Sequence, residues 1–384
     1  MPLSESTKNL MDEIMKPDRR AFLRMSGSVL ASGILSSPGP LPAKPSPTQS
    51  TGSNAGAQKI ILDTDPGVDD AFALLLAMRS SELNVMAVTA VAGNVPLSVT
   101  LPNALRLVEI ADRPDIPVAG GALSPLIRKL VTAAYAHGNN GLAGVEFPPA
   151  RLQPVKEPAS DVICRLVHEN AKNICIVGIG PLTNIALALR QDPEIASMVS
   201  SIVLMGGSLS GGNVTPAAEF NFYVDPEAAS IVFGSGIPIR MVGLDVTRRV
   251  QLTERHVQAL QAGKGRVSEA AARIAEAVMK MHRGADSERG PNLHDPLAVS
   301  SLIRPDILTF EDYQVEIETM GSITAGESVG WKHAPARHAA PMGTTGVAKI
   351  DSDLPFRANA KVATGVDSEK FFELLISRLT TTGR

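Results

Sequence analysis

Apolar and polar positions along the chain predict repeated strand–helix units from Gln58 onward. Short apolar runs typical of buried strands are followed by segments with the spacing of amphipathic helices. Strands are expected at 60–62, 84–92, 116–119, 174–179, 201–205 and 239–244, and helices at 71–76, 98–111, 159–171, 185–190, 226–233 and 297–302. This alternation predicts an α/β fold: an open, mostly parallel, doubly wound (Rossmann-like) sheet with helices on both faces.

The first 57 residues do not share this pattern. A weakly apolar stretch, 25–37, follows the segment Asp18-Arg19-Arg20-Ala21-Phe22-Leu23-Arg24, and together they resemble a twin-arginine export signal. The stretch is too short for a permanent transmembrane helix, and the alternative is a basic, disordered tail. We expect a signal segment at 1–43, a linker rich in Pro, Ser and Gly at 44–57, and one large domain at 58–384. The protein is then expected to be periplasmic or secreted through the twin-arginine route.

Composition excludes several classes of partner. The net charge is −3 and the two signs are interspersed, so no basic face is expected for nucleic acid or an acidic membrane. The single Trp disfavours stacking of single-stranded nucleic acid on the protein. We therefore expect no nucleic-acid partner and no stable membrane anchor. The two cysteines, Cys164 and Cys175, are expected to be buried thiols, with a disulfide as the alternative in an oxidising compartment.

Four aspartates lie within eight residues, between the first predicted strand and the first predicted helix: Asp63, Asp65, Asp69 and Asp70. Ligands of open α/β sheets bind at this place, outside the carboxyl ends of the strands. Carboxylates this close repel one another, and a hard divalent cation with oxygen ligands would hold them together.

Three other interpretations of the aspartates compete with a cation site. An Asp at a helix start, such as Asp69, often only caps the helix. A calcium loop of the EF-hand type would need a carboxylate where this chain has Leu74. A phosphatase of the haloacid-dehalogenase type would use Asp63 as nucleophile, but Gly67 stands where that class has Thr or Val, which weakens this interpretation.

Further polar residues recur where predicted strands end, on loops after them or just before helices: Asn94, His137, Asn213, Glu219, Asn221, His294 and Asp295. Each one alone is more often a helix cap. At the carboxyl ends of strands in one sheet, they would converge on one mouth. Carboxylates and amides without a basic cluster suit a neutral polyol, such as a sugar ring, better than a phosphate.

With these residues assembled, the chain resembles the nucleoside hydrolase family of the inosine–uridine-preferring type. The family motif Asp-Thr-Asp-Pro-Gly-x-Asp-Asp-Ala occurs unbroken at 63–71. Further family blocks occur at 93–94, 137–138, 180–184, 205–207, 219–221, 225–228 and 294–298. The resemblance extends from Lys59 to the end, where 371–374 looks like the terminal helix of the family.

The resemblance implies one bound Ca²⁺. Its ligands would be the carboxylates of Asp65, Asp70 and Asp295 and the backbone carbonyl of Ile179, where the family often has Thr. Two ribose hydroxyls and one water would complete the six to eight oxygen ligands that calcium prefers. The residues that match those gripping the ribose are Asp69, Asn94, Asn213, Glu219 and Asn221.

The implied activity is hydrolysis of the N-glycosidic bond of a ribonucleoside, a small-molecule substrate, to ribose and a free nucleobase. Asp65 would take a proton from a water activated by the metal, and His294 would donate to the leaving base. Phe220 and His137 match residues that line the base pocket. Homodimers or homotetramers are usual in the family, and we expect one of them here.

One departure from the family concerns the stretch ahead of His294, where a Tyr and an Arg often assist the leaving base. This chain has His282 and Arg283 nearby, which could serve or simply be solvated. Two alternative functions remain: a periplasmic nucleoside-binding protein without turnover and an Asp-dependent phosphatase.

Overall fold

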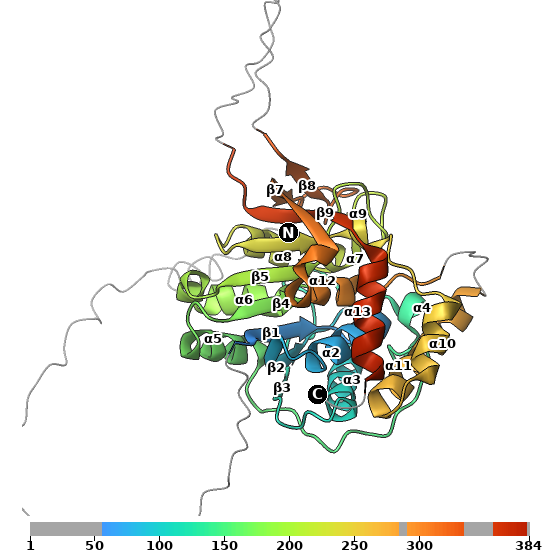
Figure 1. Ribbon diagram of the computed structural model, residues 1–384. Helices are drawn as coiled ribbons and strands as arrows, with labels where there is room; N and C mark the ends of the chain where they lie inside the picture. Colours follow the sequence, from blue (N-terminus) through green and yellow to red (C-terminus); the bar gives the residue numbers. More distant parts are fainter. Residues whose placement is uncertain (1–55, 284–289, 334–355, 382–384) are drawn as a thin grey trace, which may run out of the picture. The chain divides into compact units, whose positions relative to one another are not determined.

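The computed structural model describes residues 56–283, 290–333 and 356–381, which belong to one unit of the chain, Ser53–Arg384 (Figure 1). The predicted signal segment and most of the linker lie outside these residues, so the domain boundaries stay a prediction. Within the described part, no helix has both the length and the apolar character needed to cross a membrane.

A nine-stranded sheet forms the centre of the described domain. The strands are β1 (Gln58–Thr64), β2 (Leu83–Ala90), β3 (Val118–Gly120), β4 (Cys175–Gly178), β5 (Ser201–Met205), β6 (Ile239–Val242), β7 (Leu308–Ile317), β8 (Ser328–Trp331) and β9 (Ala360–Val366). Their order is β3-β2-β1-β4-β5-β6-β9-β7-β8, and every pairing from β3 across to β9 is parallel. Only β7 runs antiparallel, to β9 and to β8.

Helices cover both faces of this sheet. They are α2 (Val68–Met78), α3 (Leu97–Ile110), α4 (Ala134–His137), α5 (Ala159–Glu169), α6 (Thr183–Gln191), α7 (Phe220–Val224), α8 (Pro226–Phe233), α9 (Leu244–Thr247), α10 (Glu254–Ala262), α11 (Arg266–Arg283), α12 (His294–Ile303) and α13 (Ser368–Thr380), with short 3₁₀ turns at Pro193–Ser197 and Pro305–Ile307. Side chains of β1 alternate between the faces. Ile60 and Leu62 pack in the cluster formed by α2, α3 and α9–α13, and Ile61 packs against α5, α6 and α8. The predicted doubly wound α/β fold is therefore confirmed.

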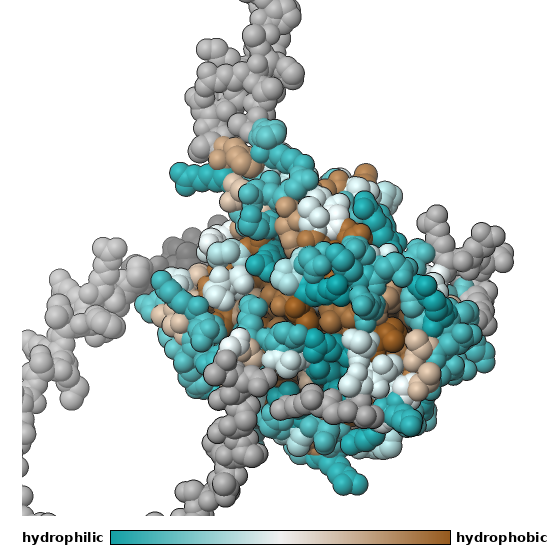
Figure 2. Space-filling view, viewed as in Figure 1, coloured by the Kyte–Doolittle hydropathy of each residue, from teal (hydrophilic) through white to brown (hydrophobic). Residues whose placement is uncertain are grey.

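The face that carries α2, α12 and α13 is turned toward the viewer in Figure 1, where the three helices lie side by side. Helix α2 is buried along its whole length, because it lies between the sheet and its neighbours α3, α11 and α12. Seen in space-filling form, this view is mostly hydrophilic, with a band of hydrophobic residues across its centre (Figure 2). The apolar run at 71–76 matches the burial of α2 on all sides, which leaves this helix without a polar face.

The predicted elements agree with the observed ones to within two residues for strands and three for helices. The segment 138–158, predicted as a loop, contains no helix or strand. The second predicted loop, 284–293, lies mostly outside the described residues. Cys164 and Cys175 are both buried and unpaired, so the alternative of a disulfide is wrong in this structure.

The strand order reverses at β1, which has β2 on one side and β4 on the other. From β1 the chain continues to β2 in one direction and reaches β4 in the other. In open α/β sheets such a reversal leaves a crevice at the carboxyl ends of the strands, where ligands bind. The acidic turn after β1 lies at this crevice, next to the end of β4 at Gly178.

Candidate active site

Four donors hold Asp70 in place: three come from the end of β1 and the turn that follows it, and one comes from Asn94 after β2. One carboxylate oxygen accepts from the Thr64 hydroxyl at 2.6 Å and from the Asp65 backbone N–H at 3.2 Å. The other accepts from the Gly67 N–H at 2.9 Å and from Asn94 Nδ2 at 3.0 Å. Asp70 lies at N3 of α2, where the helix dipole favours a negative charge. Its carboxylate is therefore fixed and has little freedom to turn away from its neighbours.

Asp65 is completely buried and has one carboxylate oxygen without a partner. Oδ2 accepts from the Asn94 N–H at 2.6 Å, whereas no hydrogen bond from the described residues reaches Oδ1. Two glycines pack against this carboxylate: a Cβ on Gly93 would lie 2.1 Å from Oδ2, and one on Gly180 would lie 2.5 Å from Oδ1. A buried oxygen that lacks a donor is costly unless a ligand satisfies it. The position of Asp65 thus indicates a missing positive or hydrogen-bonding ligand.

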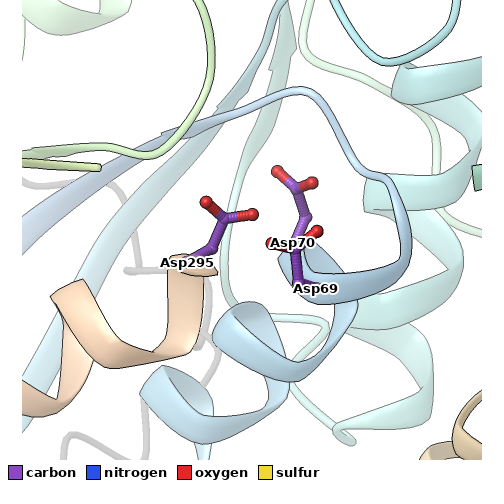
Figure 3. Close-up of side chains that lie close together, drawn as sticks. All are labelled: Asp69, Asp70 and Asp295. Carbon is purple, nitrogen blue, oxygen red and sulfur yellow. The ribbon is translucent and has the colours of Figure 1, made fainter. Parts of the chain in front are cut away.

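Asp69, Asp70 and Asp295 form a compact group of carboxylates (Figure 3). One oxygen from each lies within 4.8 Å of those of the other two, and all three residues are buried. Figure 3 shows Asp295 at the start of α12 and the other two at the start of α2, with the carboxylates on the same side of the two helices. The packing of α12 against α2 therefore brings together acids that are far apart in the sequence.

Burial and mutual repulsion make these carboxyl groups hard to ionise. Burial raises the pKa of Asp65, Asp70 and Asp295, because the charged form loses its hydration. Neighbouring carboxylates raise these pKa values further, chiefly Asp70 for Asp65, and Asp69 for the other two. Within the described residues, no lysine or arginine forms an ion pair with any of them.

Two further buried carboxyl groups, those of Asp63 and Glu219, also have raised pKa values. Burial raises the pKa of Asp63 to about 7, although Thr89 and Asn184 donate to one of its oxygens at 2.5 and 2.8 Å. Burial also raises the pKa of Glu219 to about 7, against the effect of three backbone N–H donors. Glu219 caps α7, so its carboxylate is fixed at the helix start.

The three asparagine side chains near the cluster are oriented by the backbone. Asn94 Nδ2 donates to the Asp65 carbonyl and to Asp70, and Asn221 Nδ2 donates to the carbonyls of Ile179 and Met205. In the described network, Oδ1 of both residues is left as an acceptor. Asn213 has the opposite arrangement, because its Oδ1 accepts from the Phe220 N–H at 2.9 Å and its Nδ2 is left as a donor.

A pocket opens above these groups. It is lined by Asp69, Asn94, Ala133, Tyr135, Ala136, His137, Ile179, Met205, Asn213, Glu219, Phe220, Asn221, His294 and Asp295. The predicted site residues Asp65 and Asp70 are not part of its wall and lie fully buried beneath it. The structure thus brings all the predicted site residues into one place, at the carboxyl edge of the sheet.

Two histidines line this pocket. His137, at the end of α4, accepts from the Val68 N–H through Nδ1 at 3.0 Å and lies 3.9 Å from Asp69. The backbone N–H of His294 donates to Asp69 at 3.2 Å. Asp69 therefore links the start of α12 to the start of α2.

Some lining residues were not among those predicted. Tyr135 and Met205 line the pocket without having been singled out as site residues. Met205 opens the family block at 205–207, whereas no local motif marks Tyr135. His282 is partly buried near the end of α11 and does not line the pocket. The suggestion that His282 assists the leaving base is therefore not supported by its position. The side chain of Arg283 lies outside the described residues.

The sequence was compared with protein families and with individual relatives. The family model of the inosine-uridine preferring nucleoside hydrolases matches residues 60–373. A pyrimidine-specific ribonucleoside hydrolase, RihA, of Salmonella gallinarum is 41% identical over 324 residues, which cover 84% of this chain and 98% of the relative. The RihA of Photobacterium profundum is 46% identical over 274 residues, covering 71% of this chain and 88% of the relative.

Solved structures give the same result. A plant nucleoside hydrolase, PpNRh1, superimposes with a TM-score of 0.76 at 35% identity and covers 85% of this chain and 99% of its own. A purine-preferring ribonucleoside hydrolase from Gardnerella vaginalis superimposes with a TM-score of 0.74 at 31% identity, covering 84% and 98%. The family motif at 63–71 therefore occurs in the matching fold and at the crevice where that fold binds ligands. This chain belongs to the family of inosine-uridine preferring nucleoside hydrolases.

Proposed function

We propose that this enzyme hydrolyses the N-glycosidic bond of ribonucleosides, giving ribose and a free nucleobase, with pyrimidine ribonucleosides as preferred substrates. The observation that carries this proposal is the group of buried carboxylates at the pocket: Asp69, Asp70 and Asp295 lie together, and Asp65 interacts electrostatically with Asp69 and Asp70. The preference for pyrimidines is proposed from the names of the RihA relatives.

The donor set fits a divalent cation, and we propose Ca²⁺. The free oxygen of Asp65 and the mutually repelling carboxylates of Asp70 and Asp295 are hard oxygen donors without any other positive partner in the described residues. The carbonyl of Ile179, which lines the pocket, would complete the protein ligands. When bound, such a cation neutralises the carboxylates and lowers the pKa of a water beside it.

Asp65 is the proposed general base. A base needs a free lone pair directed at the reacting water, and Oδ1 is the carboxylate oxygen of this residue that no donor occupies. Its second oxygen is anchored by the Asn94 N–H, so the carboxylate cannot rotate freely. The remaining carboxylates stabilise the positive charge that develops on the ribose ring as the bond to the base breaks.

The polar wall is proposed to hold the ribose hydroxyls. Asn94 and Asn221 offer Oδ1 acceptors, and Asn213 offers an Nδ2 donor, because the protein backbone or a buried carboxylate occupies the other end of each amide. Asp69 and Glu219 add carboxylate groups to the pocket wall. These groups match a neutral polyol by donor and acceptor type.

The leaving base would contact His137, His294 and Phe220. Phe220 is 7% exposed and supplies an apolar surface, while the histidines supply hydrogen-bond donors. His294 is proposed as the hydrogen-bond donor to the leaving base, because it lies at the start of α12 directly beside the carboxylate group.

The phosphatase alternative is not supported by the geometry. Its nucleophile would be Asp63, which is completely buried, bonded to Thr89 and Asn184, and absent from the pocket wall. Among the described residues that line the pocket, none is a lysine or arginine that could hold a phosphate. A binding protein without turnover would need no general base, yet Asp65 offers a free oxygen.

The first prediction concerns the metal. Purified enzyme should carry about one Ca²⁺ per chain, and Asp65→Asn should lose both the metal and turnover, because the free oxygen is replaced by a neutral amide group. The measurement is elemental analysis together with uridine hydrolysis. Asp312→Asn, at an exposed ion pair with Lys361, is the control and should change neither. Zinc in the protein, or full activity after exhaustive chelation, would contradict the calcium proposal.

The second prediction concerns pH in the metal-free enzyme. The folded-state pKa values of Asp63 and Glu219, about 7, exceed their ordinary values of 3.8 and 4.5. The folded state therefore binds more protons than the unfolded state between pH 4 and 7, so stability is lost as pH rises through about 7. The melting temperature of the chelated protein should fall by several degrees from pH 5.5 to 8, and added Ca²⁺ should reverse much of the loss at pH 8. A melting temperature that rises over this range without metal would contradict the prediction.

The third prediction isolates His294. Hypoxanthine and uracil are poor leaving groups that need a donor as the bond breaks, and a donor directed at developing negative charge is worth about 10²–10³-fold. A nitrophenyl riboside releases a stable anion and needs little such help. His294→Ala should therefore lose most kcat/KM on uridine and inosine and keep much of it on the nitrophenyl riboside. His168→Ala, at an exposed pair with Asp192, is the matched control. Equal losses on both kinds of substrate would mean that His294 only positions Asp295.

The fourth prediction concerns the N-terminus, which lies outside the described residues. We propose export through the twin-arginine route, supported by the sequence alone. Replacing Arg19 and Arg20 together with Lys should leave the folded precursor in the cytoplasm, as measured by cell fractionation. An unchanged distribution of the double variant would show that the segment is only a tail.

A further inference from the structure

The ring of His294 has a partner from an element that contributes nothing else to the site. Its Nδ1 lies 2.8 Å from Oγ1 of Thr247, the last residue of α9. Thr247 is completely buried and does not line the pocket. Thr247 lies just after the carboxyl end of β6 and outside the pocket wall. Its hydroxyl therefore contacts His294 but would not contact a substrate in the pocket.

The direction of this hydrogen bond follows from the surroundings of the hydroxyl. In the described part of the chain, Oγ1 of Thr247 has no other hydrogen-bond partner. If Nδ1 donated its proton to Oγ1, the hydroxyl proton would be buried without an acceptor, which native structures avoid. The arrangement that satisfies both groups has the hydroxyl donating to Nδ1. The ring proton of His294 is then on Nε2, the nitrogen that Thr247 leaves available to the pocket.

His137 reaches the same state by a different means. A backbone N–H can only donate, so the contact of the Val68 N–H with Nδ1 makes that nitrogen an acceptor and leaves the ring proton on Nε2. Both histidines that line the pocket would thus present an Nε2–H group. In His137 the backbone sets the tautomer and no side-chain substitution removes the donor. In His294 a side chain sets the tautomer, so one substitution tests this effect.

We propose that Thr247 is a positioning residue that holds His294 in the tautomer with its proton on Nε2, directed at an acceptor atom of the leaving nucleobase. This inference rests on the proposed function. When the glycosidic bond breaks, its electron pair stays on the base and spreads to the carbonyl oxygens of a pyrimidine or the ring acceptors of a purine. The Nε2–H of His294 donates a hydrogen bond to that developing charge and keeps its proton, and the released base takes a proton from water. With the wrong tautomer, Nε2 would present a lone pair and repel the same charge.

The test compares Thr247→Val, which removes the hydroxyl at similar size, with Thr247→Ser, which keeps it. Both variants are assayed as metal-loaded enzymes on uridine and on a nitrophenyl riboside. Thr247→Val should lower kcat on uridine by about tenfold, the order expected for one charge-stabilising hydrogen bond, with KM little changed. Its kcat on the nitrophenyl riboside should stay within about twofold, and Thr247→Ser should restore uridine turnover to near that of the original enzyme.

A second measurement reads the tautomer directly. Nitrogen-15 NMR of histidine-labelled enzyme distinguishes protonated from unprotonated ring nitrogens, and the signals of His294 are those missing from His294→Gln. The original enzyme and Thr247→Ser should show a proton on Nε2 and none on Nδ1. Thr247→Val should show a mixture of the two tautomers. A proton on Nδ1 in the original enzyme would overturn the proposal whatever the kinetics.

The remaining outcomes separate this inference from the proposed function. Equal losses on both substrates in Thr247→Val, with less bound metal, would mean that Thr247 only supports α9 and the start of α12, and would overturn the positioning role. A selective loss on uridine in His294→Ala that Thr247→Val does not share would overturn the role of Thr247 alone. Equal losses on both substrates in His294→Ala would instead overturn the donor role of His294 on which this inference rests.

Discussion

Mutual repulsion among buried carboxylates is the constraint on which the site depends. Asp70 and Asp295 lie on two helices that pack against each other, α2 and α12, and Asp65 lies on the turn that leads into α2, which is buried along its length. The fold stabilises this arrangement with hydrophobic contacts and backbone donors, which do not neutralise the charge. A cation is the simplest group that relieves the repulsion, and the same charge then serves the reaction. The same repulsion between carboxylates thus destabilises the fold and favours a cation at the site.

Much of the fold could be predicted because parallel strands buried on both faces are continuous apolar runs. The motif at 63–71 lies on the turn where it was expected, and the prediction of the nucleoside hydrolase family is confirmed by the family match and by the relatives. Asp295, at the start of α12, was placed with Asp70 by the family resemblance, and an oxygen of each lies within 4.8 Å of the other. The roles of the individual site residues, the calcium ion and the export route stay predictions.

Other parts were not predicted, for different physical reasons. Helix α11 has a helical spacing in Val267, Ala271, Ile274 and Val278, yet its many alanines give a weak apolar signal. Strand β7 is half-exposed at the antiparallel edge, where β patterning is less regular. Thr247 was not predicted because its relevance is a tertiary contact with a residue 47 positions away. Nothing local distinguishes such a threonine from an ordinary buried one.

The two glycines packed against the Asp65 carboxylate have a consequence for reading other members of the family. Gly93 and Gly180 carry no functional group, but any side chain there would occupy the space of the Asp65 oxygens. A relative could therefore keep every acidic residue and still be unable to hold that carboxylate in this position. Inspection of the aspartates alone would classify such a protein as an active hydrolase, whereas inspection of the two glycines would mark it as a pseudoenzyme.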